Sequence, residues 1–583
     1  MRKYLLVVKI ITAPFCQRLG GKIKEKIMAK FQRKPIQYDE RGFRKFGWMD
    51  KLAYAAGDFG CNMSFALKST HQTFWLVYML LDSNLLSILV LITQIWDAIN
   101  DPLIGALIDA DRRKYRLGKF KSYILLGAIG LTFAGALSFL PVPTADTWLK
   151  AVLFILGYVF WDAFYTVANV PYGSMLSLVS NNEGEKAQLS TWRSIGSMIG
   201  NMFPMMILPT IMWKDIKYDG TGVVQGVADK LFHTHPETGA AYKIGDLMIN
   251  PDTMEPFQEL QGMTVFIVAI VMGVLGLLAF LFMIKKITLR VDESSVKVGE
   301  GQGKFNILVA AKNFFTNRPA IGATLAAMGM FLGMNSASTA TSIMFATYFG
   351  MPKLSGIASA IGFVPMLIFM PFIKKIVTKY GKKEASVVGT LVSCAGALLM
   401  FVFPAIPNRT VGMVMYILAL AIFGIGMGTY TCVSWALMAD AIDYNEWKTG
   451  KREEGTVYSL HSFFRKLAQG VGPTIVIALM GVLGYVSANG VNGQTPETAK
   501  NMCWLVAGLY CVSALFMIVG IGVIYNLNKK TTDKMYADLS AKREAAAQQA
   551  AIDAAPEVET VFEDAQGAVE SADIVAEDST TEE

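Results

Sequence analysis

Long blocks of apolar residues recur along most of the chain, separated by short polar segments. Each block holds about 20 residues or more, which is the length that a helix needs to cross roughly 30 Å of hydrocarbon. Membrane strands would appear instead as short segments of alternating polarity, and that pattern is absent. The pattern therefore predicts an all-α membrane protein.

The apolar blocks predict twelve transmembrane helices. They are expected near residues 52–80, 84–110, 122–141, 148–179, 190–213, 262–284, 320–349, 354–373, 385–405, 411–440, 456–484 and 501–527.

The basic residues of the connecting segments predict the orientation. Segment 111–122 holds six Lys and Arg residues and segment 374–383 holds five, whereas the connections on the other side hold few. Cytoplasmic connections are the ones enriched in Lys and Arg, so both termini are expected in the cytoplasm. The basic segment after the second span recurs after the eighth, which predicts two six-helix halves with the substrate between them.

This repeat divides the chain into five parts. We expect a cytoplasmic basic arm at 1–50, a first six-helix bundle at 51–284 with an extracytoplasmic loop at 214–261, a cytoplasmic linker at 285–319, a second bundle at 320–528, and a disordered acidic cytoplasmic tail at 529–583. The arm is either a basic amphipathic helix on an anionic leaflet or a disordered segment.

Composition narrows the class of function. Hydrophobic residues make up 53% of the chain and charged residues 17%, which is typical of a membrane protein. The net charge of +7 does not indicate nucleic acid, because the basic residues lie in the connections and the arm. No nucleophile–base pair, metal cluster or phosphate loop has a recognisable spacing, so we expect neither an enzyme nor a bound cofactor.

Two carboxylates within the second span are the first candidates for a site. Asp97 and Asp101 lie four residues apart and therefore on one face of a helix. Two carboxylates this close repel each other unless a cation lies between them or one holds a proton. The pair predicts a site for a coupling ion, and the structural alternative requires a salt bridge for each carboxylate.

Further polar residues in the spans are candidates for substrate binding. Arg can donate two hydrogen bonds to neighbouring hydroxyls, and an amide both donates and accepts. The candidates are Asp58, Asn62, Tyr165, Asn169, Arg193 and Lys466.

Six sequence motifs resemble one transporter family. The runs KLAYAAGDFGCN, IWDAINDP, LGKFKSYILLG, NVPYGSM, MADAIDYNEWKTGKR and GTVYSLHSFFRK are similar to the glycoside–pentoside–hexuronide cation symporters of the major facilitator superfamily. The resemblance covers roughly residues 47–527 and implies the major facilitator fold.

The resemblance also implies roles for particular residues. The family's cation ligands fall on Asp97, Asp101 and Thr166. Its sugar-contacting arginine falls on Arg193, and a lysine of the eleventh helix falls on Lys466. The two aspartates that bind sugar in the family's melibiose carriers fall on Asn62 and Asn169. The residues that bind the cation in this family are therefore present here, whereas two of the residues that bind sugar differ.

The predicted function is symport of a sugar or glycoside with Na+ or H+ by alternating access. A pentoside, hexuronide or β-glycoside is expected rather than melibiose. We expect a monomer in the cell membrane, surrounded by lipid, with no metal beyond a Na+ at the cation site. Two alternatives remain open, namely a carrier of another amphipathic solute such as a lysolipid and a non-transporting membrane sensor.

Overall fold

A computed structural model describes residues 42–290, apart from 112, 181–182, 225–226 and 228–229, and residues 314–545, apart from 451–453 and 543. Most of the predicted arm, most of the linker and the acidic tail beyond 545 lie outside the described residues.

The described residues are largely helical. The first half contains α3 (Trp48–Phe65), α4 (Lys68–Thr73), the π-helix η1 (Phe74–Tyr78), α5 (Ser83–Ala110), α6 (Lys119–Ser138), α7 (Thr147–Val179), α8 (Glu183–Met212) and α9 (Gly262–Lys286). Strands β1 (Trp213–Asp215) and β2 (Gln258–Leu260) pair antiparallel between α8 and α9. The second half contains α11 (Arg318–Phe331), η3 (Leu332–Ser336), α12 (Ala337–Met344), η4 (Phe345–Phe349), η5 (Pro352–Leu354), α13 (Ser355–Tyr380), α14 (Lys382–Leu399), η6 (Phe403–Ala405), α15 (Arg409–Thr449), α16 (Glu454–Val482), η7 (Ser487–Asn489), α17 (Pro496–Ile518) and η8 (Val519–Ile524).

Each predicted span coincides with a helix or with a run of consecutive helices. Among the described residues, eight helices are long and apolar enough to cross a membrane, which confirms an all-α membrane protein. The run 318–349 is interrupted by the π-helical turn η3, and the run 48–78 is interrupted by a turn at residues 66–67; both runs end in a π-helical turn. The count of twelve crossings stays a prediction.

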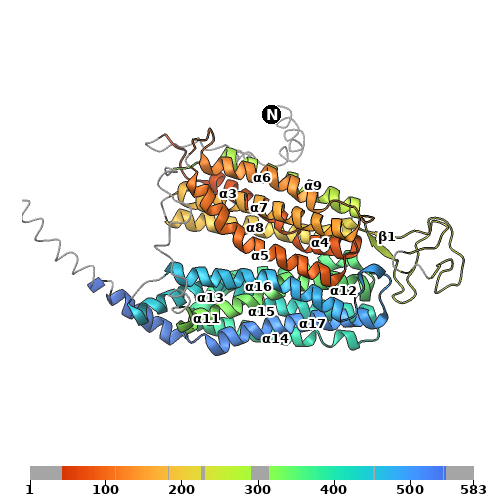
Figure 1. Cartoon of the computed structure of the whole chain (residues 1–583). Helices are drawn as coiled ribbons and strands as arrows, with labels where there is room; N and C mark the ends of the chain where they lie inside the picture. Colours follow the sequence, from red (N-terminus) through yellow and green to blue (C-terminus); the bar gives the residue numbers. More distant parts are fainter. Residues whose placement is uncertain are drawn as a thin grey trace, which may run out of the picture.

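The helices form two groups that lie side by side. In Figure 1 the helices of the first half, coloured red to yellow-green, lie above those of the second half, coloured green to blue. Across the division α5 packs against α16, α8 against α13, and α4 against α12. The segment between β1 and β2 marks one end of the molecule, which we call the loop end. The opposite end, where α3 begins and η8 stops, is called the terminal end.

The two basic connections at the terminal end share a backbone conformation, a glycine with positive φ just before the next helix. Gly118 (φ +87°) precedes α6 and Gly381 (φ +106°) precedes α14. A positive φ of this kind favours glycine, because a side chain at that position is strained. The recurrence of the turn supports the internal repeat that the sequence predicts.

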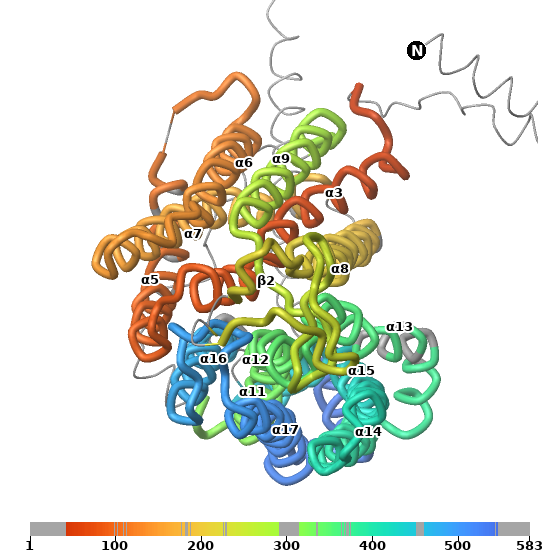
Figure 2. Tube along the Cα trace, turned by 90° about the vertical axis from the view of Figure 1, so that its right-hand side faces the viewer, coloured from red at the N-terminus to blue at the C-terminus, as the bar shows by residue number. Residues whose placement is uncertain are grey.

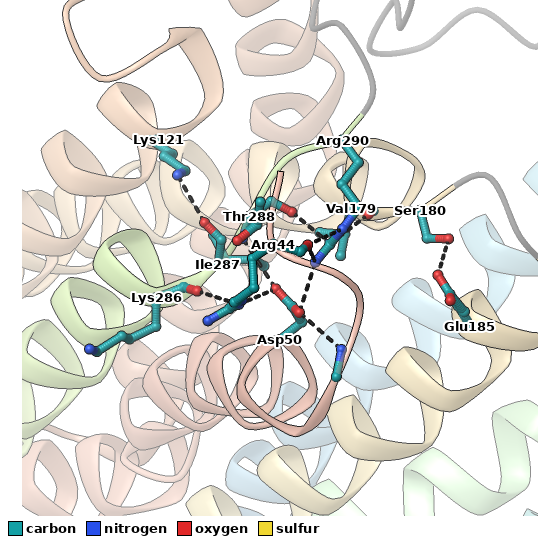
Figure 3. A network of polar contacts seen from close by, with 11 residues as sticks. Arg44, Asp50, Lys121, Val179, Ser180, Glu185, Lys286, Ile287, Thr288 and Arg290 are labelled. Atoms are coloured by element: carbon teal, nitrogen blue, oxygen red, sulfur yellow. Dashed lines mark hydrogen bonds and ion pairs between the residues drawn. The ribbon is translucent and has the colours of Figure 1, made fainter. Parts of the chain in front are cut away.

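A buried carboxylate joins the chain segments at the terminal end of the first half (Figure 3). Asp50 accepts hydrogen bonds from Arg44 Nη2 at 2.5 Å and from Arg290 Nη2 at 2.9 Å. Arg290 Nη1 also donates to the carbonyl of Val179 at 3.0 Å. The start of α3, the end of α7 and the segment after α9 are thereby tied together.

The segment predicted as a disordered tail begins with a packed helix. Residues 529–542 are helical, and Met535 and Leu539 on that helix are buried. Trp447 Nε1 donates to Asp538 Oδ2 at 3.0 Å, and Tyr536 OH donates to Asp440 Oδ1 at 2.5 Å. Residues 529–542 of the segment expected to be disordered therefore form an ordered helix, in which Met535 and Leu539, four residues apart, share a buried face.

The loop between β1 and β2 has a small core of its own and touches the second half. Its core contains Val224, Met248 and Phe257. Lys353 Nζ, just before α13, contacts Asp215 Oδ2 at 2.7 Å, and Asn492 Nδ2 donates to the carbonyl of Gln258 at 3.0 Å. Figure 2, which faces the loop end, shows this segment lying over the second half. The loop therefore bridges the two halves.

Candidate functional site

The two predicted cation-binding carboxylates each contact a lysine from another helix. Asp97 Oδ2 lies 3.9 Å from Lys68 Nζ of α4. Asp101 forms an ion pair with Lys466 of α16. The first lysine comes from the same half as α5, and the second comes from the opposite half. A salt bridge for each carboxylate is present, but one of the two spans the division between the halves.

Hydrogen bonds extend the site from α5 to α7. Thr166 Oγ1 donates to Asp101 Oδ1 at 2.8 Å, so the third predicted cation ligand lies beside the second. Asn100 Nδ2 donates to Thr166 Oγ1 at 3.0 Å and to Asp162 Oδ2 at 3.1 Å. The Asn100 side chain is fully buried, and its Oδ1 has no hydrogen-bond partner among the described residues.

Asp162 is the site residue that sequence reasoning missed. It lies one helical turn before Thr166 on α7 and is 4% exposed. Its carboxylate interacts with the Asp97 carboxylate and the Lys68 ammonium. The signal was available, because a charge inside a long apolar span usually marks a functional site. No second carboxylate lies four residues away on the same helix, so the spacing that marks Asp97 and Asp101 does not mark Asp162.

We call the seven residues that these contacts join the coupling cluster. Its members are Lys68, Asp97, Asn100, Asp101, Asp162, Thr166 and Lys466. Within residues 42–290 and 314–545, no group of three or more His, Cys, Asp and Glu side chains is arranged to hold a metal ion. The cluster also offers amide and hydroxyl oxygens, and the unpaired Asn100 Oδ1 fits a cation that takes oxygen ligands.

The predicted substrate-binding residues form a second group. Arg193 Nε of α8 donates to Asp58 Oδ1 of α3 at 3.0 Å, and Asp58 is 5% exposed. Asn62 Nδ2 donates to Asp58 Oδ2 at 3.2 Å. The Arg193 guanidinium lies over the Tyr172 ring, 5.1 Å from its centroid. Three candidates from two helices therefore meet around one carboxylate.

The remaining candidates have different surroundings. Asn169 Oδ1 lies 3.7 Å from Cys61 Sγ, next in the chain to Asn62. Tyr165 lies between the two groups, because Asp58, Lys68 and Asp97 are all among its charged neighbours. Lys466 is not with Arg193, because its partner is Asp101. The structure therefore joins Lys466 to the coupling cluster.

Two small cavities lie between the halves on the loop-end side of these groups. One has a volume of about 40 Å³ and hydroxyl-bearing residues on α4, α12 and α13. They are Ser69, Thr70, Thr73, Ser338, Ser342, Ser355 and Ser359. The second, also about 40 Å³, shares Ser338 and Ser359 and reaches Tyr510 of α17. Each is far smaller than the roughly 300–1,000 Å³ of a ligand pocket, so the halves are closely packed there.

Comparisons with known proteins show that the chain is similar to membrane transporters. Residues 53–529 match the family described as MFS/sugar transport protein. The chain is 26% identical over 507 residues to an uncharacterized symporter, YjmB, of Bacillus subtilis (strain 168), covering 86% of this chain and 96% of that protein.

Two further relatives have a named substrate. The isoprimeverose transporter of Lactiplantibacillus pentosus is 25% identical, with 85% of this chain and 92% of the relative covered. The glucuronide carrier protein homolog of Escherichia coli (strain K12) is also 25% identical, with 85% and 95% covered.

A solved structure shares the fold. The inward-facing bacterial homologue of the iron transporter ferroportin superposes with a TM-score of 0.51 at 12% identity, covering 81% of this chain and 98% of that one. At this identity the likeness shows the fold alone.

Proposed function

The chain belongs to the MFS/sugar transport protein family, and from that premise we propose that it moves a sugar or glycoside together with Na+ or H+ by alternating access. It is a multi-pass membrane transporter of the major facilitator fold and not an enzyme. The preferred solutes are a pentoside, a hexuronide or a β-glycoside, and the names of the sugar-carrying relatives support this class.

The observation that carries the proposal is the Asp101–Lys466 ion pair. It lies in the coupling cluster and joins α5 of the first half to α16 of the second. A cation that binds Asp101 competes with Lys466, so cation binding changes the contact between the halves. This is the link that a symporter requires between its ion site and the movement of its halves.

The polar group around Asp58 supports sugar binding. Arg193, Asn62 and Asn169 supply both donors and acceptors within otherwise apolar spans. The terminal end carries the basic segments 111–122 and 374–383, so we place it in the cytoplasm and the protein in the cell membrane as a monomer. No contact among the residues that the structure describes favours a lysolipid or a sensor.

The direct test is uptake into right-side-out vesicles that contain the full chain. Isoprimeverose, a methyl glucuronide, sulfoquinovose and melibiose are offered with an inward Na+ gradient or an inward proton gradient. At least one of the first three should accumulate above equilibrium, melibiose should not, and an ionophore should abolish the accumulation. If every sugar merely equilibrates whichever gradient is applied, symport is refuted.

A further inference from the structure

The group around Asp58 contains one carboxylate and one guanidinium, and the two neutralise each other. Arg193 Nε donates to Asp58 Oδ1 at 3.0 Å, and the Asp58 side chain is 8% exposed whereas that of Arg193 is 38% exposed. Four other ionisable side chains interact with this ion pair, and each is ordinarily uncharged at neutral pH. They are Tyr54, Cys61, Tyr165 and Tyr172. The group therefore has no net formal charge.

The lysines of the neighbouring coupling cluster also have carboxylate partners. Lys68 Nζ lies 3.9 Å from Asp97 Oδ2. Lys466 forms an ion pair with Asp101. Arg465, next to Lys466 in the chain, lies over two aromatic rings of the second half. Both lysines, like Arg193, therefore already have a carboxylate beside them.

The polar atoms around the ion pair suit hydroxyl groups. Asn62 Nδ2 donates to Asp58 Oδ2 at 3.2 Å and to the Asp58 carbonyl at 2.9 Å, so the carboxylate is held from two sides. The amides of Asn62 and Asn169 both donate and accept, as a sugar hydroxyl does. An ionised carboxylate only accepts, and it requires a positive partner when it leaves water. The group therefore matches the hydroxyls of a sugar better than an acidic substituent.

We propose that Asp58 makes the substrate site selective for neutral glycosides, because it neutralises Arg193 and leaves an anionic sugar without a positive partner. The inference rests on the proposed symport and narrows its solutes to pentosides and β-glycosides that carry no acidic group. An anion bound to the guanidinium would also lie near the Asp58 carboxylate, and like charges repel strongly where water is excluded.

The first test compares two sugars that differ in one substituent. Methyl β-D-glucoside is neutral, whereas methyl β-D-glucuronide has an ionised carboxylate in the same place. Each competes with uptake of the labelled sugar that accumulates in vesicles of the wild type. The half-inhibitory concentration of the glucuronide should be at least about tenfold higher, because its charge is buried without a partner. Equal competition, or no competition by either sugar, would contradict the proposal.

Variants of Asp58 separate charge selectivity from a structural role. Asp58→Asn leaves Arg193 without its carboxylate, so inhibition by the glucuronide should improve by at least about tenfold relative to the glucoside. Asp58→Glu keeps the charge and should keep the preference for the glucoside. The double variant Asp58→Asn/Arg193→Gln removes both charges and should lose the improvement. If Asp58→Asn fails to fold, Asp58→Ser removes the same charge and should shift the preference in the same direction.

The matched control is Asp252→Asn, which removes an exposed carboxylate of the loop between β1 and β2. It changes the net charge of the protein as Asp58→Asn does, but it should leave the ratio of the two half-inhibitory concentrations at the wild-type value. A variant Asp58→Asn that folds and keeps the wild-type ratio overturns the role of Asp58.

Failure of this inference can be told from failure of the proposed symport. A wild type that accumulates methyl glucuronide or sulfoquinovose as well as isoprimeverose would refute the selectivity and leave symport intact. If no sugar accumulates under either gradient, symport fails. Thermal unfolding of the purified full-length protein then still compares the two methyl glycosides, since a ligand that binds the folded state raises the melting temperature. A rise with the glucoside at a lower concentration than with the glucuronide would support the selectivity, and the reverse or no rise would refute it.

Discussion

At the scale of single residues, the carboxylates of α5 are held by lysines on two different helices. Lys68 belongs to the same half as Asp97, and Lys466 belongs to the half opposite Asp101. The two contacts therefore have different consequences when the halves move. The Lys68 contact can persist within one half, whereas the Lys466 contact must break when the halves separate at that point.

We predict that Asp97→Asn or Asp101→Asn abolishes accumulation of sugar against a gradient while exchange of sugar across the membrane remains. Each change removes a negative charge that the cation needs, but it leaves the group around Asp58 intact. Uptake and counterflow in vesicles measure the two activities separately. Accumulation at the wild-type level in both variants would remove these residues from coupling.

We predict that Arg193→Ala and Asn169→Ala raise the sugar concentration for half-maximal transport. Removing a hydrogen-bonding group from the pocket around the buried Asp58 leaves its partner unsatisfied, which costs about 1–3 kcal/mol, or roughly 5- to 150-fold in affinity. Arg193→Lys keeps the charge but loses the planar fork, so it should have an intermediate effect. Half-saturation unchanged in both alanine variants would place the sugar elsewhere.

At the scale of elements, side chains from the connections stabilise the helix ends at the terminal end. Asp111 follows α5 and accepts hydrogen bonds from Tyr115 OH, from Tyr123 OH at 2.6 Å and from the Arg113 amide at 2.9 Å. The hydrogen bonds from Tyr115 and then Tyr123 lower the pKa of Asp111 to about 2. Asp111 therefore ties the basic segment to the first turns of α6.

The lowered pKa of Asp111 predicts how the stability of the protein depends on pH. The pKa of Asp111 in the folded state lies below its ordinary value of 3.8. The ionised Asp111 carboxylate therefore stabilises the fold fully above pH 3.8, and this stabilisation is lost as the pH falls toward 2. Asp111→Asn should lower the melting temperature by the same amount from about pH 8 to about pH 5. If the difference in melting temperature between Asp111→Asn and the wild type changes steadily across this pH range, the low pKa of Asp111 is contradicted.

The helix at 529–542 predicts where the chain can be shortened. Deleting the residues after 545 should leave transport within about twofold of the wild type, because the acidic segment has too few apolar residues to form a core. Deleting everything after 528 should lower the melting temperature, since burial of Met535 and Leu539 is lost. Thermal unfolding and vesicle uptake are measured for both truncated proteins. If the two have the same melting temperature, the helix at 529–542 does not stabilise the fold.

At the scale of the whole molecule, polar contacts among the described residues join the two halves at the coupling cluster and toward the loop end. Gln72 of α4 accepts a hydrogen bond from Thr339 of α12 at 2.6 Å. The loop between β1 and β2 adds the Asp215–Lys353 ion pair at 2.7 Å. Opening a path at the loop end requires that these contacts break.

We predict that Asp215→Asn or Lys353→Gln favours opening at the loop end. Both side chains are partly exposed, so the pair contributes only about 0–1 kcal/mol and the open population should rise by at most roughly fivefold. The rate at which a thiol reagent labels Ser338→Cys, in the hydroxyl-lined cavity, measures this opening. The exchanged pair Asp215→Lys/Lys353→Asp should restore the slow labelling, and unchanged labelling in both single variants would contradict the prediction.

The sequence by itself determined the class of fold and part of the site. Span length, the recurring basic connections and the positions of Asp97 and Asp101 on one helix face are local properties, so the sequence pattern contains them directly. The arrangement of Asp58 and Asn62 on α3 is local in the same way. Membership of the family could be predicted because each motif that the chain shares with the family is a run of consecutive residues.

Only the tertiary structure decided which groups meet. Asp162 has no charged partner four residues away on α7, and its neighbours Asp97 and Lys68 come from α5 and α4. Lys466 reaches Asp101 only because α16 packs against α5. The packing of residues 529–542 likewise depends on α15, which lies about 90 residues earlier. Electrostatic contacts act through space, so residues on separate helices join one site without leaving a periodic signal in the sequence.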